Sequence, residues 1–347
     1  MTLEHRIKYP VQEVPVENNP GWEYIVIGRV LAIPQLPAKL AKNDLFRHLL
    51  IAGSTGSGKS HTASKISERV AREFKIPVIV FDWHGEYADL LREYIEVNPH
   101  SSPIPIFTDD PDDLILVSSI MELTPPQEYL LDKILRRVDF SKTKSIESLL
   151  DYVESYPEES NWMRETKLAL HRRLSSLTRE NYHSLFEIRG RIEFKQGVLE
   201  AGKPIVLNLA EINDPNIRRL YASFYLKRLV DFTVNQGRRL LVVLEEAVNY
   251  ISRSQPVKPI CETLREFRKF GVGLVIISQS LSQLVEDVSV NTNTKIIHSV
   301  KSKQDLEVVE KTLYLDQELL ETLPYIEPGE AIYSTPSLKK PVLIKIE

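Results

Sequence analysis

The sequence predicts an α/β fold with a central, mainly parallel β-sheet, and three observations support this prediction. Short continuous apolar runs at residues 49–52, 77–81 and 240–244 are typical of strands that a parallel sheet buries on both faces. Segments with apolar residues at spacings of three and four, which predict helices, alternate with these runs. The first run leads into a glycine-rich turn, and a helix-forming segment at residues 63–74 follows. Strands that alternate with helices are the mark of α/β proteins.

The glycine-rich turn matches the phosphate-loop pattern G-x-x-x-x-G-K-[ST] in full. We expect its residues to contact a bound nucleotide: Gly53, Ser54, Thr55, Gly56, Ser57, Gly58, Lys59, Ser60 and the following His61. Glycines let the backbone curl so that several N–H groups point at one anion, and the next helix adds its free N-terminal donors. Lys59 supplies a mobile cation for the phosphates of ATP, and Ser60 offers a hydroxyl to Mg²⁺. The alternative is a glycine-rich turn that matches the pattern by chance.

The chain before and after this turn contains weaker signals. Residues 1–20 are polar and lack periodicity, which indicates a flexible arm. Residues 24–33 predict a strand or a hairpin bent at Gly28, and Pro34 and Pro37 are expected to break it. Beyond the second strand, residues 97–113 are rich in proline, aspartate and serine, which predicts a loop. Residues 114–118 are apolar and are predicted to form one more strand.

From residue 125 to about 189 the pattern becomes helical. Apolar residues recur at spacings of three and four, and Pro125-Pro126 suits the first turn of a helix. We interpret this stretch as an all-helical insertion between two halves of the α/β core. The predicted division is an N-terminal arm with a short strand or hairpin at 1–36, the first half of the core at 37–113, the helical insertion at 114–200 and the second half of the core at 201–347.

The second half of the core repeats the alternation of strands and helices. Strands are predicted at 204–209, 239–244, 273–278 and 295–300, and helices at 216–234, 259–270 and 303–314. Ser302 and Asp305 have the spacing of a capping box for the last of these helices. Residues 330–334 and 341–346 are predicted to be antiparallel strands at the edge of the sheet.

Composition narrows the functional classes. The 347 residues carry a net charge of −4, so any nucleic-acid binding has to come from a local patch or a ring of charge. The single cysteine, Cys261, excludes an internal disulfide framework and fits a reducing compartment. Neither an N-terminal signal core nor an apolar run long enough for a membrane span is present, so we expect a cytoplasmic protein without a membrane partner.

Two carboxylates follow the strand at 240–244. Parallel strands present their carboxyl ends at one edge of the sheet, where such folds bind ligands. We predict that Glu245 holds Mg²⁺, directly or through water, and that Glu246 orients and deprotonates the attacking water. The alternative is a pair of glutamates at the start of a helix, stabilised by the helix dipole.

Other polar residues end strands at the same predicted edge. Gln279 follows the strand at 273–278 and could contact the γ-phosphate or the water, with a solvated strand end as the alternative. Asp82 ends the strand after the phosphate loop and is a candidate for the Mg²⁺ shell. His84 with Gly85 could form a functional turn, and Glu86 lies beside them. The alternative for this group is an ordinary turn that ends the strand.

Taken together, these residues resemble the HerA-like branch of the HerA–FtsK ATPases. The similarity covers about residues 40–335 and rests on Arg47-His48, GSTGSGKSHT, FDWHGEY after the second strand, VVLEEA, the segment RKFG with GLVIISQS, Asn291-Thr-Asn-Thr294, Leu323-Pro and Pro328-Gly-Glu330. One departure is a glutamate, Glu245, where such proteins more often have aspartate.

The resemblance implies a RecA-like P-loop ATPase core that assembles as a hexameric ring, with ATP between subunits and double-stranded DNA in the centre. In such rings an arginine of one subunit stabilises the transition state at the next. Arg47 and Arg268 occupy the matching positions, and Arg265 is a nearby substitute. The alternative for each is local ion pairing. Pore-lining candidates are Arg253, Lys258, Lys301 and Lys303, with solvated loop residues as the alternative.

Members of this family begin with a small β-barrel that docks a nuclease of the NurA type. Only 52 residues precede Gly53 in this chain, so we expect no full barrel, and the sequence leaves the nuclease partner open. The leading prediction is an ATP-driven double-stranded DNA translocase or helicase that acts in DNA processing or repair. The alternatives are a nucleotide-gated platform that controls a partner protein, and a secretion or conjugation motor.

Overall fold

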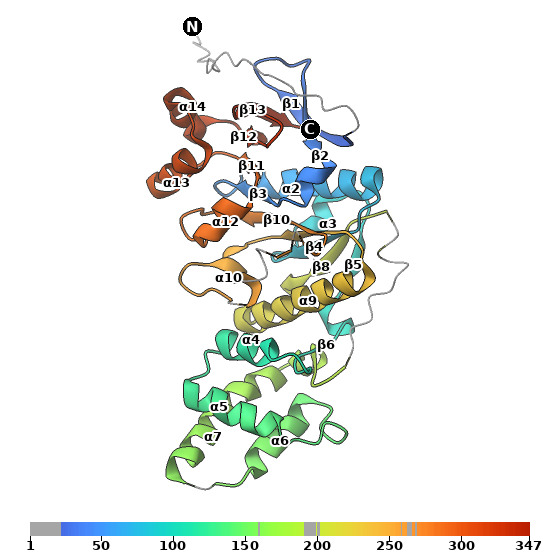
Figure 1. The fold of residues 1–347 in the computed structure, drawn as a ribbon, viewed down its shortest axis with the longest axis vertical. Coiled ribbons are helices and arrows are strands. Elements are labelled where there is room, and N and C mark those ends of the chain that lie inside the picture. Colours follow the sequence, from blue (N-terminus) through green and yellow to red (C-terminus); the bar gives the residue numbers. More distant parts are fainter. Residues whose placement is uncertain are drawn as a thin grey trace.

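The structure, a computed structural model, describes residues 22–158, 160–190, 199, 202–257, 259–261, 266–267 and 269–347. The molecule is elongated, with a broad part built on a sheet and a narrower part made of helices (Figure 1). Cores of buried apolar residues lie on both faces of the sheet, and one of them continues into the helices.

The described residues form one sheet of eleven strands in the order β2-β1-β13-β12-β11-β3-β10-β9-β4-β8-β5. The strands are β1 (Tyr24–Val30), β2 (Pro37–Ala41), β3 (Leu49–Ala52), β4 (Val78–Asp82), β5 (Ile95–Val97), β8 (Ile205–Asn208), β9 (Leu240–Leu244), β10 (Val272–Ser278), β11 (Thr294–Ile297), β12 (Glu330–Ser334) and β13 (Val342–Ile346). Neighbouring strands from β11 to β5 pair in parallel, and the pairs from β11 to β2 are antiparallel. The predicted mainly parallel sheet is therefore confirmed.

Alternating side chains of the central strands pack on different helices. Leu49 and Ile51 of β3 share a core with Ile66 of α2 (Lys59–Arg69), whereas Leu50 of the same strand belongs to the core that contains Phe224 of α9 (Pro215–Gln236). Successive side chains of a strand point to opposite faces, so a continuous apolar run is what a sheet covered on both sides requires. The π-helical turn Val70–Phe74 extends α2 to the end of the predicted helix.

The narrow part is helical, as the sequence predicts. It contains α4 (Asp112–Ile120), α5 (Pro125–Leu135), α6 (Ile146–Ser155) and α7 (Asn161–Leu174), and a two-stranded sheet of β6 (Ile104–Pro105) and β7 (Phe186–Glu187) lies near its junction with α9 (Figure 1). Helix α5 starts at Pro125, and Thr124 forms a capping box with Gln127. The proposed boundaries at residues 36, 113 and 200 stay a prediction.

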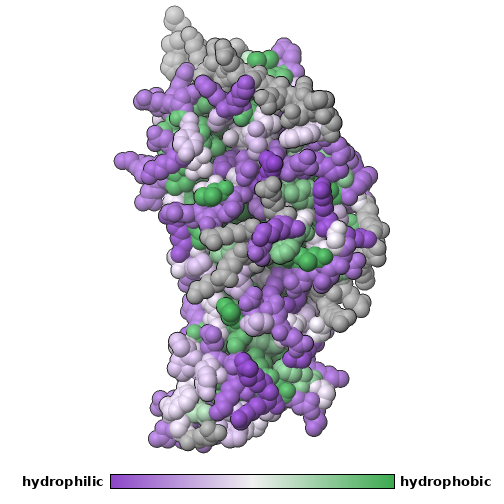
Figure 2. All heavy atoms as spheres, in the orientation of Figure 1, coloured by the Kyte–Doolittle hydropathy of each residue, from purple (hydrophilic) through white to green (hydrophobic). Residues whose placement is uncertain are grey.

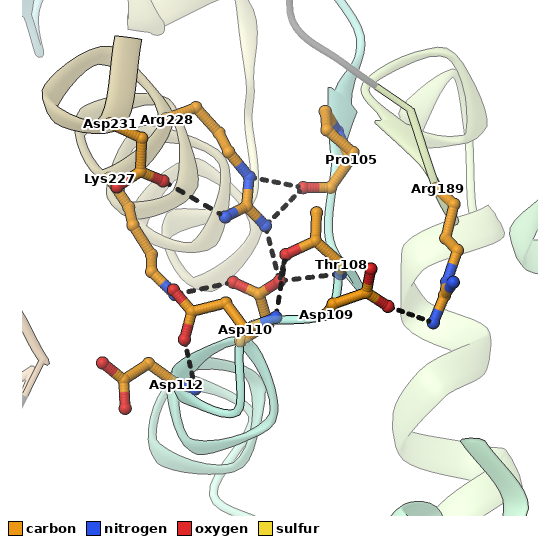
Figure 3. A network of polar contacts seen from close by, with 10 residues as sticks. Pro105, Thr108, Asp109, Asp110, Asp112, Arg189, Lys227, Arg228 and Asp231 are labelled. Atoms are coloured by element: carbon orange, nitrogen blue, oxygen red, sulfur yellow. Dashed lines mark hydrogen bonds and ion pairs between the residues drawn. The ribbon is translucent and has the colours of Figure 1, made fainter. Parts of the chain in front are cut away.

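A buried polar network joins this helical part to α9 (Figure 3). The Asp113 carboxylate accepts hydrogen bonds from Arg228 Nη2 at 2.7 Å, Lys227 Nζ at 2.8 Å and Thr108 Oγ1 at 2.6 Å. Arg228 also donates to the carbonyl oxygen of Pro105. Burial alone would raise the pKa of Asp113, but Arg228 and Lys227 hold it below its usual value. The network fixes the start of α4 against the sheet-covering helix.

One predicted strand is wrong. Residues 114–118 lie inside α4, where Leu116, Val117 and Ile120 are buried and Ile115 is exposed. That pattern follows the helical period, in which positions three and four apart share a face. A short run of consecutive apolar residues looks the same in a buried strand and in a helix that is covered on most sides.

The two ends of the chain also differ from expectation. The second arm of the N-terminal hairpin is β2, which begins at Pro37, and the register shifts between Val26 and Gly28. A Cβ on Gly28 would lie 2.0 Å from the carbonyl oxygen of Lys345, so only glycine allows this approach of β13. β12 and β13 are antiparallel, as predicted, but they lie inside the sheet because β1 and β2 extend it beyond them.

The remaining helices are short. They are α1 (Lys42–Leu45), α3 (Tyr87–Leu90), α10 (Val248–Ile251), α12 (Glu286–Asn291), α13 (Lys303–Leu313) and α14 (Gln317–Thr322). Ser302 caps α13, but the Asp305 carboxylate accepts from Ser280 and Ser282 after β10, so the capping box is replaced by a link between two loops. The helix predicted at 259–270 is described only in part: residues 259–261 are helical, 266–267 and 269–270 lie in turns, and the rest lie outside the described residues. The arm at 1–20 lies outside them as well.

The surface in the view of Figure 2 is mostly hydrophilic, and apolar residues gather there only in small patches. In the described ranges no helix combines the length and the apolar character that crossing a bilayer demands.

Candidate functional site

The phosphate loop lies between the carboxyl end of β3 and the start of α2, as predicted. Its glycines adopt conformations that other residues avoid, with φ of 151° at Gly53, 75° at Gly56 and 105° at Gly58. The loop is anchored from outside. The Ser54 N–H donates to the carbonyl oxygen of Ser299 at 2.7 Å, and the Gly329 N–H donates to that of Ser57 at 3.0 Å. The cradle that a phosphate group requires is therefore held by two neighbouring segments.

Lys59 and Ser60 begin α2 at the mouth of this loop. Lys59 is buried, and its Nζ donates to the carbonyl oxygen of Ser54 at 3.0 Å. Burial lowers the pKa of Lys59, while the charges of Glu246 and Glu245 act in the opposite direction. The Ser60 hydroxyl donates to Glu245 Oε1 at 3.2 Å. The loop lysine, the loop serine and the carboxylate from the far strand thus meet in space.

Glu245 is a buried carboxylate with few partners. It is only 3% exposed, and the Trp83 N–H donates to its Oε2 at 3.0 Å. Burial raises the pKa of Glu245, and the neighbouring Asp82 raises it further. A divalent cation would relieve this repulsion, so the donor set of Ser60 and Glu245 fits Mg²⁺. Among the described residues no cluster of three metal-binding side chains exists, so phosphate and water oxygens would have to complete the shell.

Asp82 mainly stabilises a turn. Its Oδ1 accepts from the N–H groups of Gly85 and Glu86, at 2.8 and 3.1 Å, and its Oδ2 accepts from the N–H of Tyr87 at 3.0 Å. This is the arrangement that the strand-ending alternative describes. Asp82 lies beside Glu245, and a direct contact of Asp82 with a metal stays a prediction.

Glu246 and Gln279 form the second half of the cluster. Glu246 has a φ of 45°, and Gln279 Nε2 donates to its Oε1 at 2.5 Å. The Thr55 hydroxyl donates to Gln279 Oε1 at 2.8 Å, so the glutamine connects the candidate base to the phosphate loop. His84 Nε2 lies 3.8 Å from Glu246 Oε1. Four segments far apart in sequence therefore contribute to one edge of the sheet.

Sequence reasoning missed His298, which lies beneath the phosphate loop. The ring is fully buried, with Nδ1 2.8 Å from the carbonyl oxygen of Glu330 and Nε2 2.9 Å from Thr62 Oγ1. A carbonyl only accepts, so Nδ1 carries the proton, and Nε2 faces the Thr62 hydroxyl, which also donates to the carbonyl oxygen of Gly58 at 3.0 Å. A Cβ on Gly53 would lie 2.7 Å from His298 Cβ. No sequence signal singles out this histidine, because its partners come from three separate segments.

Arg47 lies at the opposite edge of the sheet, before β3. It lines a cavity of about 600 Å³ together with Arg238, Arg239 and Lys269. Arg239 stacks over the ring of Phe46, with its guanidinium carbon 4.9 Å from the ring centroid. The other arginine candidates, Arg268 and Arg265, lie outside the described residues, as does Lys258.

The remaining predicted positions are less informative. His61 is exposed on α2, and Lys301 and Lys303 are exposed before and at the start of α13. Arg253 donates to the carbonyl oxygen of Leu284 at 2.7 Å and pairs with Glu286, so its side chain is engaged locally. The site residues brought together are Lys59, Ser60, Glu245, Glu246 and Gln279.

Comparison with known structures places the fold. The VirB4 structure of Thermoanaerobacter pseudethanolicus superposes with a TM-score of 0.69, 17% identity and coverage of 95% of this chain and 97% of that one. The bacterial conjugative coupling protein TrwB superposes with a TM-score of 0.67, 15% identity and coverage of 94% and 89%. One TrwB structure is a complex with ADP and Mg²⁺. At these identities the likeness establishes the fold alone.

Sequence comparison identifies the family. A protein named DNA double-strand break repair helicase HerA from Sulfurisphaera tokodaii is 27% identical over 93% of this chain and 69% of its own length. Its namesake from Sulfolobus acidocaldarius is 28% identical over 92% and 68%. The chain thus spans about two thirds of these relatives. The family model described as "Helicase HerA, central domain" matches residues 25–229, more than half of the chain. This chain therefore belongs to the HerA helicase central-domain family.

Proposed function

We propose that this protein is an ATP-hydrolysing motor of the HerA type that acts on double-stranded DNA. One observation carries the proposal: beside a complete phosphate loop, Ser60 donates to Glu245, and Gln279 links Glu246 to Thr55 of the loop. A loop that only binds nucleotide needs no second carboxylate, whereas hydrolysis needs a base for the attacking water. The relatives' printed names, which describe helicases of double-strand break repair, support DNA as the substrate.

The residues divide the work as follows. The loop N–H groups and Lys59 bind the phosphates of ATP, and Ser60 with Glu245 would hold Mg²⁺. When bound, this ion supplies charge that stabilises the phosphoryl oxygens. Glu246 accepts the proton of the attacking water, and Gln279 keeps the Glu246 carboxylate oriented toward the loop. Gln279 follows β10 and also contacts Thr55 of the phosphate loop. A change in the loop when the terminal phosphate leaves would therefore move Gln279 and the end of β10.

We further propose a hexameric ring in which Arg47 serves the neighbouring subunit. Arg47 precedes β3 and the phosphate loop follows it, so roughly 20 Å of extended chain separates the arginine from Gly53 of its own site. Arg47 would instead reach the nucleotide site of a second copy of the chain. Arg268 has the same role in the proposal. A nuclease of the NurA type is a further candidate partner of such a ring.

The decisive experiment compares wild type with Glu246→Gln. We expect wild type to hydrolyse ATP faster when duplex DNA is added. The variant should keep its affinity for a fluorescent ATP analogue and lose about 10²–10⁴-fold in turnover, since amide nitrogen cannot accept the proton. Glu307→Gln, an exposed change on α13, is the matched control and should leave turnover intact. Retained turnover in Glu246→Gln would assign the base to another residue.

The DNA part of the proposal has its own test. Purified protein is mixed with a labelled duplex at low ionic strength, and binding is followed as salt increases. We expect binding that weakens steeply with salt, as for other phosphate-dominated complexes. ATP hydrolysis without any duplex binding at low salt would contradict the DNA motor and favour a nucleotide-gated platform.

A further inference from the structure

A small pocket with three arginines lies where the helical part meets α9. Its volume is about 220 Å³, and its walls are the end of α4, the end of α7 and the start of α9 (Figure 1). Arg172, Arg173 and Arg179 line it. The pocket is on a different part of the molecule from the nucleotide edge, and none of the predicted site residues that the structure describes lines it.

Some of the charged side chains that line the pocket already have hydrogen-bond partners. Arg173 Nη1 donates to the carbonyl oxygen of Met121 at 2.7 Å. Asp214, one of two carboxylates in the lining, caps α9 by accepting from the N–H groups of Asn216 and Ile217. Glu122, the other, accepts from Gln255 at 3.4 Å.

Arg172 and Arg179 differ from these residues. Within the described ranges, neither side chain has an ion pair or a hydrogen bond with another residue, and both are exposed. The pocket therefore holds two guanidinium groups whose donors are available for a ligand. Guanidinium groups match the planar, bidentate geometry of phosphate oxygens.

We propose that this pocket binds a backbone phosphate of duplex DNA. The proposal rests on the DNA-motor function proposed above. The pocket is smaller than the 300–1,000 Å³ typical of sites for drug-sized ligands, so it suits a single phosphate group better than a whole nucleotide. A chain with a net charge of −4 needs such local cations to hold DNA at all.

A short chain of contacts leads from this pocket to the nucleotide edge. Arg218, one turn along α9, donates from Nη1 to the carbonyl oxygen of Trp83 at 2.9 Å. The N–H of Trp83 donates in turn to Glu245, which accepts from the Ser60 hydroxyl. DNA that orders the start of α9 would therefore stabilise the position of the Glu245 carboxylate. The inference predicts that phosphate binding in the pocket raises ATP turnover.

The test is the double variant Arg172→Ala/Arg179→Ala in the full chain. Loss of the single phosphate contact in the pocket should lower the slope of log affinity against log salt by about 0.9, the value per neutralised phosphate in B-DNA. The advantage of wild type over the variant should thus shrink roughly 3.5-fold between about 50 and 200 mM salt. ATP turnover without DNA should be unchanged, whereas its stimulation by duplex should fall.

The matched control is Arg136→Ala/Lys142→Ala. It removes the same charge from the helical part, but both side chains lie outside the pocket and pair with their own aspartates. Its salt slope should equal that of wild type. An unchanged slope in the pocket variant, or an equal loss in the control, would overturn the inference while leaving the DNA motor intact. A wild-type protein that binds no duplex would overturn both.

Discussion

The two ends of the central strands carry opposite charge. At the carboxyl ends, the acidic edge, Glu245, Glu246 and Asp82 surround the phosphate loop. At the amino ends, the basic edge, Arg47, Arg238, Arg239 and Lys269 line a cavity of about 600 Å³, and no carboxylate is among the described residues that line it. In the proposed reaction the acidic edge would supply the base and the cation ligands, and the basic edge would supply charge that stabilises the phosphates.

If Glu246 and Arg47 have the roles proposed above, one chain carries two halves of the reaction. Phosphoryl transfer needs a base near the water and positive charge near the leaving phosphate. The carboxyl and amino ends of parallel strands are separated by the length of the strands. Within one chain, Arg47 at one end therefore cannot reach the phosphates bound at the other. Two chains packed edge to edge would bring the halves together. The predictions below test this comparison.

The largest effect is expected at the basic edge. Arg47→Ala should leave ATP binding intact and lower turnover by roughly 10³-fold or more, the usual worth of an arginine supplied by a neighbour. Mixing Arg47→Ala with Glu246→Gln should restore part of the activity, because some interfaces then combine an intact Arg47 with an intact Glu246. A steady-state ATPase assay across mixing ratios measures this. Mixtures no more active than either variant would show that Arg47 does not act between chains.

A substitution at the junction of the helical part with α9, away from both edges, should lower stability without lowering ATP turnover per folded site. Asp113→Ala removes the carboxylate from the junction network and leaves Arg228 buried without its main partner, at a cost of about 3–5 kcal/mol. Asp109→Ala removes an exposed partner of Arg189 and should change little (Figure 3). Urea unfolding measures both variants. If folded Asp113→Ala also loses turnover per site, the junction takes part in the chemistry and the contrast between the edges is incomplete.

The buried His298 beneath the phosphate loop should make stability fall with pH. Burial lowers the pKa of His298 to about 4, below its ordinary value of 6.5. This contribution to stability is complete above pH 6.5 and is lost as pH falls through 4, by up to roughly 3 kcal/mol. His298→Asn should therefore lose less stability than wild type between pH 6.5 and 4 in denaturant titrations. His183→Asn, at an exposed histidine, is the control and should follow wild type.

The smallest effect is expected on thermal stability, when one glycine at each edge is replaced by alanine. Gly53→Ala would place a Cβ 2.7 Å from His298 Cβ, whereas Gly271→Ala would place one 3.2 Å from the carbonyl oxygen of Arg238. Both positions have positive φ, which costs an alanine about 1–2 kcal/mol. Only Gly53→Ala adds a severe clash, so it should lower the thermal midpoint more. Equal shifts would mean that the loop above His298 can relax.

Much of the acidic edge could be predicted from sequence. The phosphate loop needs glycines, a lysine and a serine at fixed spacing in one continuous segment, so local sequence defines its geometry. Glu245, Glu246 and Gln279 directly follow apolar runs, and parallel strands bring such positions to one edge. The structure confirms that these residues meet. Their roles in catalysis stay predictions.

Other features could not be predicted because they depend on contacts across the sequence. The apolar run at 114–118 is a helix because its neighbours cover one helical face, and the run itself does not distinguish helix from strand. The Asp82 carboxylate accepts hydrogen bonds from N–H groups of the turn after β4. Its position at the end of a strand does not reveal these bonds. β12 and β13 became internal strands when β1 and β2 paired beyond them.

The sequence by itself determined the α/β class, the phosphate loop and the family, because each is written in short segments whose residue types and spacing are sufficient. Only the tertiary structure placed His298 under the loop, gathered Arg47 with Arg238 and Arg239, and formed the pocket of Arg172 and Arg179. These sites join residues from separate segments. Their existence depends on how strands and helices pack, which no local pattern specifies.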